Sequence, residues 1–219
     1  MSIEKNLDKI VKDIDGKAAL VVVTKTRSLP EIQEVYELGF REFGENKVQD
    51  LCEKYELLPK DIKWHVIGHL QTNKVKHIAP FIHLIHSVES KKLLEEIDKQ
   101  ALKNNRIIPC LLQMHIAEEE TKFGLNEQEL KEILNLDYLN KLKNINIVGL
   151  MGMATFTDDI DKINTEFEYL KSIFDKLQFF DSTFNFNPSI LSMGMSGDYQ
   201  EAIAHGSTMV RVGSSIFKV

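Results

Sequence analysis

The stretch AALVVVTKTRS, residues 18–28, decides between the two folds that the rest of the chain allows. Its first half is rich in β-branched side chains, which is typical of a strand buried on both faces. A helix is expected next, because Ser28 and Glu31 have the spacing of a capping box. An open, doubly wound sheet would carry a glycine-rich turn between this strand and this helix. Residues 24–28 contain no glycine, so the stretch favours a closed barrel.

The alternation of buried strand and amphipathic helix continues to the end of the chain. Strands are expected at residues 18–23, 41–44, 63–68, 83–88, 108–116, 145–153, 189–193 and 208–212. Helices are expected between them at residues 28–39, 46–56, 72–79, 90–103, 126–136, 158–177 and 198–205, and residues 2–14 form an extra helix in front. Strands joined by helical crossovers must be parallel, and eight such units close into a barrel. We therefore predict an α/β fold: a single (β/α)8 TIM-type barrel domain, 1–219, with an extra N-terminal helix.

The composition is that of an ordinary globular protein, and it excludes several partners. The 219 residues include 27 Lys and Arg against 33 Asp and Glu, a formal charge of −6, which argues against binding nucleic acid. No apolar run approaches the ~20 residues that a membrane helix needs, and Glu4 and Asp8 interrupt any export signal. Cys52 and Cys110 have no paired spacing, so we expect buried thiols in a cytoplasmic protein.

Lys25 follows the first strand, at the end of the barrel where such folds carry reactive groups. Alternation places it on the same face as Val21 and Val23. Apolar neighbours solvate an ammonium group poorly, which favours the neutral amine that attacks an aldehyde to form a Schiff base. The alternative is a lysine at a strand end whose head group extends into water, and strand position alone favours that alternative.

The last strand carries a second unusual side chain. Arg211 faces away from Val210 and Val212, so if those valines pack against the outer helices, Arg211 points into the barrel. A guanidinium there needs an anion, a carboxylate or a strong acceptor.

Two small-residue loops follow the seventh and eighth strands. Residues 213–215 can turn backbone N–H groups toward a phosphate, and residues 193–197 add the hydroxyl group of Ser196. Barrels commonly hold phosphate at these two loops, although each alone is also an ordinary glycine-containing turn. Together with Lys25 and Arg211, they suggest pyridoxal 5′-phosphate (PLP).

Short motifs along nearly the whole chain resemble the pyridoxal phosphate homeostasis proteins. They are VTK at 23–25, FGEN at 43–46, WHVIG at 64–68, LQTNK at 70–74, KFG at 122–124, LSMGMS at 191–196 and AIAHGSTMVRVG at 202–213. The resemblance implies a fold similar to the barrel domain of alanine racemase and a cofactor bound without an established reaction. The sequence departs from the family at residues 216–219, IFKV, where a glycine usually follows the phenylalanine.

The resemblance also implies which residues contact the cofactor. They are Lys25, Asn46, Ser196, Arg211, Gly213 and Ser214. Lys25 would form the Schiff base, the two serines and Gly213 would hold the phosphate, and Arg211 would lie near the pyridine nitrogen. Asn46 would lie beside the ring, and it could also cap the helix that follows.

Other groups of polar residues indicate a functional site less strongly. His65 and His69 do not share one helical face, and His83 and His86 alternate on a strand. Since no carboxylate accompanies either pair at ligand spacing, we expect no metal site and a hydrogen-bonded, structural His65. The acidic run at 118–120 is expected to be a solvated loop.

Two arguments favour a carrier over a catalyst. A racemase needs proton-transfer groups on both faces of its substrate, and the second domain that supplies one of them in alanine racemase is expected to be missing here. An arginine at the pyridine nitrogen also weakens the electron sink that carbanion chemistry requires. We therefore expect a non-catalytic, monomeric protein that sequesters PLP and delivers it to PLP-dependent apoenzymes. The alternatives are a small amino-acid racemase, and an isomerase or aldolase in which Lys25 acts on a sugar phosphate.

Overall fold

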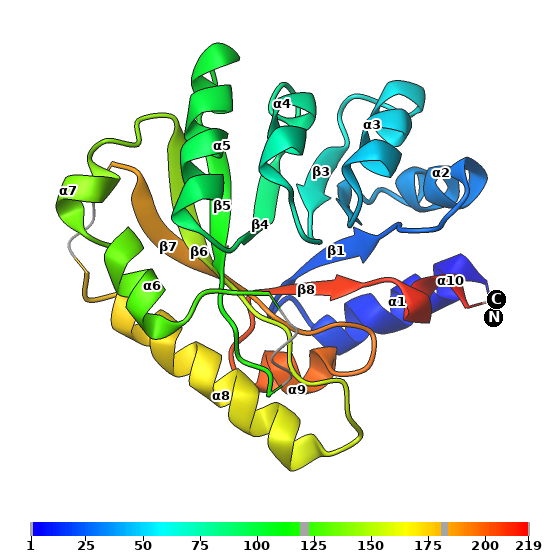
Figure 1. Ribbon diagram of the computed structural model, residues 1–219. Helices are drawn as coiled ribbons and strands as arrows, with labels where there is room; N and C mark the ends of the chain where they lie inside the picture. Colours follow the sequence, from blue (N-terminus) through cyan, green and yellow to red (C-terminus); the bar gives the residue numbers. More distant parts are fainter. Residues whose placement is uncertain (1, 119–122, 181–183, 219) are drawn as a thin grey trace.

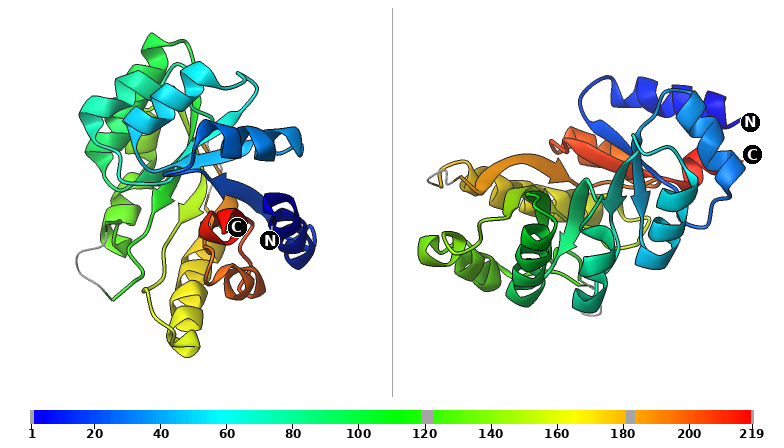
Figure 2. Two further views of the ribbon diagram at one scale, coloured as in Figure 1. Left: turned by 90° about the vertical axis from the view of Figure 1, so that its right-hand side faces the viewer. Right: turned by 90° about the horizontal axis from the view of Figure 1, so that it is seen from above.

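The protein forms a closed barrel of eight parallel strands with helices on the outside (Figures 1 and 2). The computed structural model describes residues 2–118, 123–180 and 184–218. Neighbouring strands pair in chain order, from β1 to β8 and back to β1. The strands are β1 (Ala19–Val23), β2 (Glu42–Glu45), β3 (Lys63–Val66), β4 (Leu84–Val88), β5 (Ile108–Gln113), β6 (Ile145–Met151), β7 (Phe186–Ser192) and β8 (Met209–Val212). The predicted (β/α)8 barrel with an extra N-terminal helix is confirmed.

The helices lie between the strands as expected, with two differences. They are α1 (Ile3–Ile14), α2 (Leu29–Glu37), α3 (Val48–Leu57), η1 (Thr72–Lys74), α4 (Val75–Ile78), α5 (Lys91–Lys103), α6 (Glu127–Ile133), α7 (Leu136–Leu139), α8 (Ile160–Leu177), α9 (Tyr199–Ala204) and α10 (Ser214–Phe217). The helix predicted at 126–136 ends at Ile133, because the Asn135 side chain accepts from Tyr138 N–H and starts α7. The turn predicted after β8 is the short helix α10, and β7 begins earlier than predicted.

Two cores of different character hold the barrel together. The large one lies between the strands and the helices and includes Val22, Val210 and Val212. The small one fills part of the barrel interior, where Val21 and Met209 pack together with residues of β4, β5 and β6. The interior is not wholly apolar, because buried polar side chains of β3, β4, β7 and β8 share it. In the stretches that the structure describes, no helix has the length and apolar character needed to cross a membrane.

The extra helix α1 ties the two ends of the chain together. The Asn6 side-chain amide donates to the carbonyl oxygens of Ile216 and Lys218, at 2.9 Å each. The two ends of the chain therefore lie side by side, beyond α10 at the right of the view (Figure 1). This contact anchors α10, and with it the loop that follows β8.

Candidate functional site

The carboxyl ends of β1, β2 and β8 bring Lys25, Asn46 and Gly213 to one rim of the barrel. Val23 of β1 pairs with Gly44 of β2, so Lys25 and Asn46 each lie two residues beyond the same level. On the other side of β1, the pairing of Val22 with Val212 places Gly213 next to Val23. The rim position predicted for these residues follows directly from the register of the three strands.

Lys25 itself is exposed, so the prediction of a poorly solvated amine is wrong. The strand ends at Val23, and the chain then turns through Thr26, which has a left-handed φ of 64°. The turn lifts Lys25 above the valines of its own strand and into solvent. Its amine is therefore accessible at the rim, where it can reach toward a bound molecule.

The two small-residue loops meet beside Gly213. The Ser196 hydroxyl oxygen accepts from the backbone N–H groups of Gly213 (3.2 Å) and Ser215 (3.4 Å). The Ser215 hydroxyl group donates in turn to the Ser196 carbonyl oxygen at 3.2 Å. Ser214, at the start of α10, is exposed beside them. Converging N–H and O–H donors of this kind suit the oxygens of a phosphate group.

Gly213 shows that the space at this loop is tight. A Cβ atom there would lie 2.9 Å from the Val23 carbonyl oxygen and 3.0 Å from the Val23 Cβ. A larger residue would push the loop away from β1, and with it the hydroxyl of Ser196. The residues present therefore fit the phosphate group of a cofactor at this loop.

Asn46 does not cap the helix that follows it. Helix α3 begins at Val48 with Lys47 in the cap position, so the capping interpretation of Asn46 is wrong. Asn46 instead packs against Gly68 beyond the end of β3, where a Cβ atom on the glycine would lie 2.7 Å from the Asn46 Cβ. The half-buried Asn46 is thus held at the rim by its backbone, and its amide is not used as a cap.

Arg211 points into the barrel, as predicted from the alternation with Val210 and Val212. It is only 3% exposed, and it donates to the Ser192 hydroxyl oxygen (2.6 Å) and to the Gly152 carbonyl oxygen (3.1 Å). Burial lowers the pKa of Arg211 to about 10, against the opposing attraction of Asp198. The guanidinium therefore remains charged at neutral pH and lies one layer below the rim.

A buried ion pair supports the turn that carries Lys25, and no sequence pattern predicted it. Lys54 of α3 donates to the Glu45 carboxylate at 2.6 Å and to the Thr24 carbonyl oxygen at 2.8 Å. The Thr24 hydroxyl group donates to the same carboxylate oxygen at 2.5 Å. The side chain of Glu45 is fully buried and that of Lys54 is 11% exposed. The backbone just before Lys25 is thus fixed by a charged side chain from a helix.

A line of hydrogen bonds runs from Arg211 across the barrel interior. Ser192 Oγ lies 3.0 Å from His86 Nδ1, and His86 Nε2 lies 2.8 Å from His65 Nδ1. His65 Nε2 lies 2.6 Å from Glu42 Oε2, at the opposite end of the barrel. Arginine can only donate and a carboxylate can only accept, so with one proton on each ring all of these bonds point from Arg211 toward Glu42.

Burial lowers the pKa of His86 well below its usual value, which keeps this ring neutral. Although burial acts against it, hydrogen bonds from His65 and Lys63 hold the pKa of Glu42 at about 2. The prediction that His65 is hydrogen-bonded is confirmed. We name these five residues, Arg211, Ser192, His86, His65 and Glu42, the interior polar chain.

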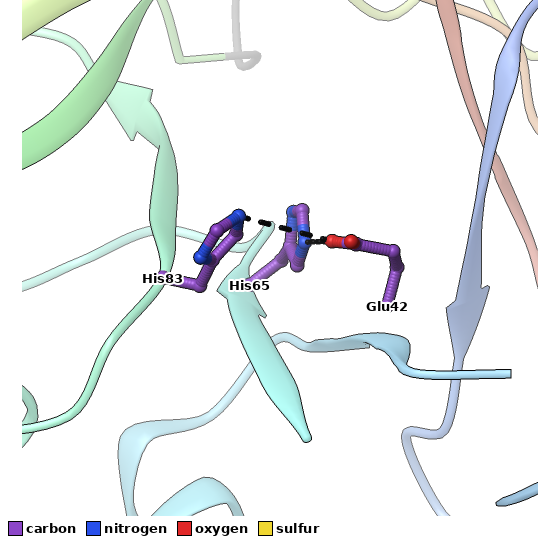
Figure 3. A group of neighbouring side chains, drawn as sticks. All are labelled: Glu42, His65 and His83. Carbon is purple, nitrogen blue, oxygen red and sulfur yellow. Dashed lines mark hydrogen bonds and ion pairs between the residues drawn. The ribbon is translucent and has the colours of Figure 1, made fainter. Parts of the chain in front are cut away.

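The expectation that no carboxylate accompanies the histidines is wrong. Glu42 from β2 meets His65 from β3 and His83 from the segment before β4 (Figure 3). The three potential ligand atoms lie within 4.8 Å of one another. Glu42 pairs with Lys63, two residues before His65, so the register of the two strands brings these side chains to the same end of the barrel. Alternation within a single strand does not reveal this neighbour.

Some sequence-based expectations fall outside the described residues. They concern Lys122 of the KFG motif, Glu119 and Glu120 of the acidic run, and Val219 at the end of the chain.

The fold defines the class of protein. A family profile described as "Alanine racemase, N-terminal domain" matches residues 1–219. The solved alanine racemase of Clostridium difficile 630 has a TM-score of 0.79 and 14% identity, and the match covers 99% of this chain and 56% of that one. At that identity the likeness concerns the fold alone.

Closer relatives place the chain more narrowly: it belongs to the family of pyridoxal phosphate homeostasis proteins. It is 39% identical over 201 residues to the pyridoxal phosphate homeostasis protein of Aquifex aeolicus, covering 91% of this chain and 86% of the relative. The corresponding Synechocystis protein is 36% identical over 211 residues, covering 95% and 94%. The structure of PipY of Synechococcus elongatus PCC7942 with PLP bound has a TM-score of 0.88 at 30% identity, covering 99% of this chain and 100% of that one. These matches confirm the family resemblance of the motifs.

Proposed function

We propose that this chain binds pyridoxal 5′-phosphate as a Schiff base on Lys25 and takes part in vitamin B6 homeostasis by sequestering and delivering the cofactor. The observation that carries the proposal is the register that brings the accessible amine of Lys25 beside the loop of Ser196 and Gly213. When bound, PLP supplies an aldehyde for an amine and a phosphate dianion for hydrogen-bond donors. The match to PipY, whose solved structure has PLP bound, covers 99% of this chain and supports the PLP-binding part of the proposal.

Each rim residue has a distinct part in binding. The backbone N–H groups of Gly213 and Ser215 become available to an anion when the Ser196 side chain rotates away from them, and its O–H group can donate to the same anion. Ser214 is exposed at the same loop and adds a further donor. Asn46 lies on the other side of Lys25 from this loop and would border the pyridine ring of PLP.

Arg211 is the reason to expect a carrier rather than a catalyst. Its direct partners, Ser192 and Gly152, are neutral, and it keeps its charge at neutral pH. In the position that the family resemblance implies, a charged guanidinium disfavours protonation of the pyridine nitrogen and weakens carbanion stabilisation. We therefore propose that the protein holds PLP without catalysing a reaction of its own.

Reductive trapping tests the role of Lys25. The freshly purified protein should show visible absorbance, and borohydride followed by peptide mass spectrometry should place a pyridoxyl group on Lys25. Lys25→Ala should lose both signals. Lys47→Ala is the matched control, because Lys47 is an exposed lysine at the same rim, one residue after Asn46, and its loss should change neither signal. An adduct spread over other lysines, or absorbance that survives in Lys25→Ala, would refute the assignment.

Proton exchange separates a carrier from an amino-acid racemase. Racemisation exchanges the α-proton, so the loaded protein is incubated with single L-amino acids in deuterated water. We expect exchange no faster than with free PLP. Exchange of the α-proton well above the rate with free PLP would refute the carrier proposal and indicate a racemase.

Delivery has its own assay. We propose that the protein works as a monomer in the cytoplasm and passes PLP to PLP-dependent apoenzymes. Mixing the loaded protein with the apo form of a PLP-dependent aminotransferase should restore aminotransferase activity faster than the release of PLP into solution allows. Reactivation at the rate of free release would argue for sequestration alone.

A further inference from the structure

We propose that Glu42, His65 and His83 form a binding site for a divalent metal ion of the zinc class at the end of the barrel opposite the PLP rim. The three side chains come from three separate segments and converge on one point (Figure 3). None of them has a part in the proposed PLP site, so the inference is independent of that function.

The distances fit a site that closes around an ion. Glu42 Oε2 lies 2.6 Å from His65 Nε2 and 4.0 Å from His83 Nε2. Metal–ligand bonds of about 2.0–2.2 Å in tetrahedral geometry require ligand atoms about 3.3 Å apart. The first separation must therefore open and the second must shorten, each by less than about 1 Å. The two histidine nitrogens lie within 4.8 Å of each other, so they must approach by at most about 1.5 Å. The separation of 4.0 Å is too long for a hydrogen bond, so the contact between His83 and the carboxylate is a long ion pair.

The exposure of the three ligand side chains increases in an order that suits metal entry. The His65 side chain is fully buried, that of Glu42 is 28% exposed and that of His83 is 46% exposed. A buried ligand sets the position of the ion, while an exposed ring can rotate to complete the site. Two histidines and one carboxylate, with one position left for water, form a donor set that zinc commonly takes.

His65 also has the support that metal-binding histidines usually have. Its second ring nitrogen, Nδ1, lies 2.8 Å from His86 Nε2, and His86 is fixed in turn by Ser192. Such an outer hydrogen bond fixes the ring so that the other nitrogen faces the metal. Here it aims Nε2 of His65 at Glu42. Metal binding requires His65 Nε2 to give up the proton that it donates to Glu42, so both neutral rings switch tautomer. His65 Nδ1–H then donates to His86 Nε2, and His86 Nδ1–H donates to Ser192 Oγ.

One neighbouring charge opposes the ion. The Lys63 ammonium group lies 2.7 Å from Glu42 Oε1, where it competes with a cation for the same carboxylate. The Lys63 side chain is 50% exposed and can swing into solvent when the ion enters. Because of this competition, removing the charge of Lys63 should strengthen metal binding.

The test titrates the full-length, tag-free protein with Zn²⁺ after chelator treatment, in competition with a chromogenic chelator. Three variants accompany the wild type. His83→Asn removes an exposed ligand with little risk to folding, and Lys63→Met removes the competing charge. His77→Asn is the control, because His77 is an exposed histidine on α4 outside the cluster. Thermal unfolding of each variant checks that it folds.

We expect the wild type to bind one equivalent of Zn²⁺. His83→Asn should weaken binding by at least about tenfold, Lys63→Met should strengthen it several-fold, and His77→Asn should leave it unchanged. Co²⁺ in place of Zn²⁺ should give visible absorption bands in the wild type that are absent in His83→Asn. Equal affinities of wild type and His83→Asn, no effect of Lys63→Met, or no binding of Zn²⁺ in large excess would each overturn the proposal.

Discussion

Replacing Lys54 by methionine should destabilise the protein by about 3–5 kcal/mol, because the buried Glu45 carboxylate then loses its cation. The Lys54 ammonium lies 2.6 Å from that carboxylate, and methionine keeps the aliphatic stem in place. For a domain of this size, the loss corresponds to a Tm lower by about 6–20 °C. The second bond of Lys54, to the Thr24 carbonyl oxygen, adds a functional effect. Without it the turn that carries Lys25 is less well fixed, so less PLP should be trapped by borohydride.

A double-mutant cycle separates the charge effect from packing. Glu45→Gln in the Lys54→Met background removes the unpaired charge and keeps an acceptor for the Thr24 hydroxyl group. Because a buried pair and a neutral replacement are often similar in stability, the double variant should recover most of the loss. The free energies of unfolding come from urea denaturation of all four proteins. A cost below about 1 kcal/mol for Lys54→Met, or a double variant no more stable than the single one, would refute the reasoning.

Three further predictions concern other parts of the molecule. Gly149→Ala should abolish or severely impair folding, since a Cβ there would lie 1.8 Å from the Ile190 carbonyl oxygen at a φ of +151°; a thermal transition within a few degrees of wild type would contradict this. Ser196→Ala should leave the fold intact and weaken PLP binding about tenfold, the loss of one good hydrogen bond to a charged group, measured by equilibrium dialysis; unchanged affinity would remove Ser196 from the site. Burial and the hydrogen bond to Asp13 raise the pKa of Tyr199 to about 12, above the usual value of 10, so the unfolded chain loses this proton first and stability falls as the pH rises from 10 to 12. Tyr199→Phe should lose less stability over this range in urea denaturation, and an equal loss would contradict the assignment.

The order of the elements could be predicted from the sequence because each strand is defined by its own run of residues. The run before Lys25 is rich in β-branched residues, and the alternation of Arg211 with its neighbouring valines predicts that the arginine side chain faces the barrel interior. Sequence patterns did not predict the features of a residue that depend on its neighbours in three dimensions. The exposure of Lys25 follows from a backbone turn at Thr26, which no apolar pattern records.

For a related reason, sequence patterns do not predict the buried ion pair or the cluster of one glutamate and two histidines. Glu45 and Lys54 lie on a strand and on the helix after it, and nothing in their spacing says that they pair in the interior. Glu42, His65 and His83 are brought together only when three segments of the barrel take their register. A search for ligands within one segment therefore finds histidines without their carboxylate.

The interior polar chain constrains how this family can change over evolutionary time. Each member satisfies the hydrogen-bonding capacity of the next, from Arg211 through Ser192 to His86. A single apolar replacement leaves the neighbouring residue with a buried donor or acceptor that has no partner. This costs more stability than replacing both residues of the pair by apolar ones. Lineages that alter one link are therefore expected to have altered its neighbour as well, so that these positions are inherited as a set even though they lie on different strands.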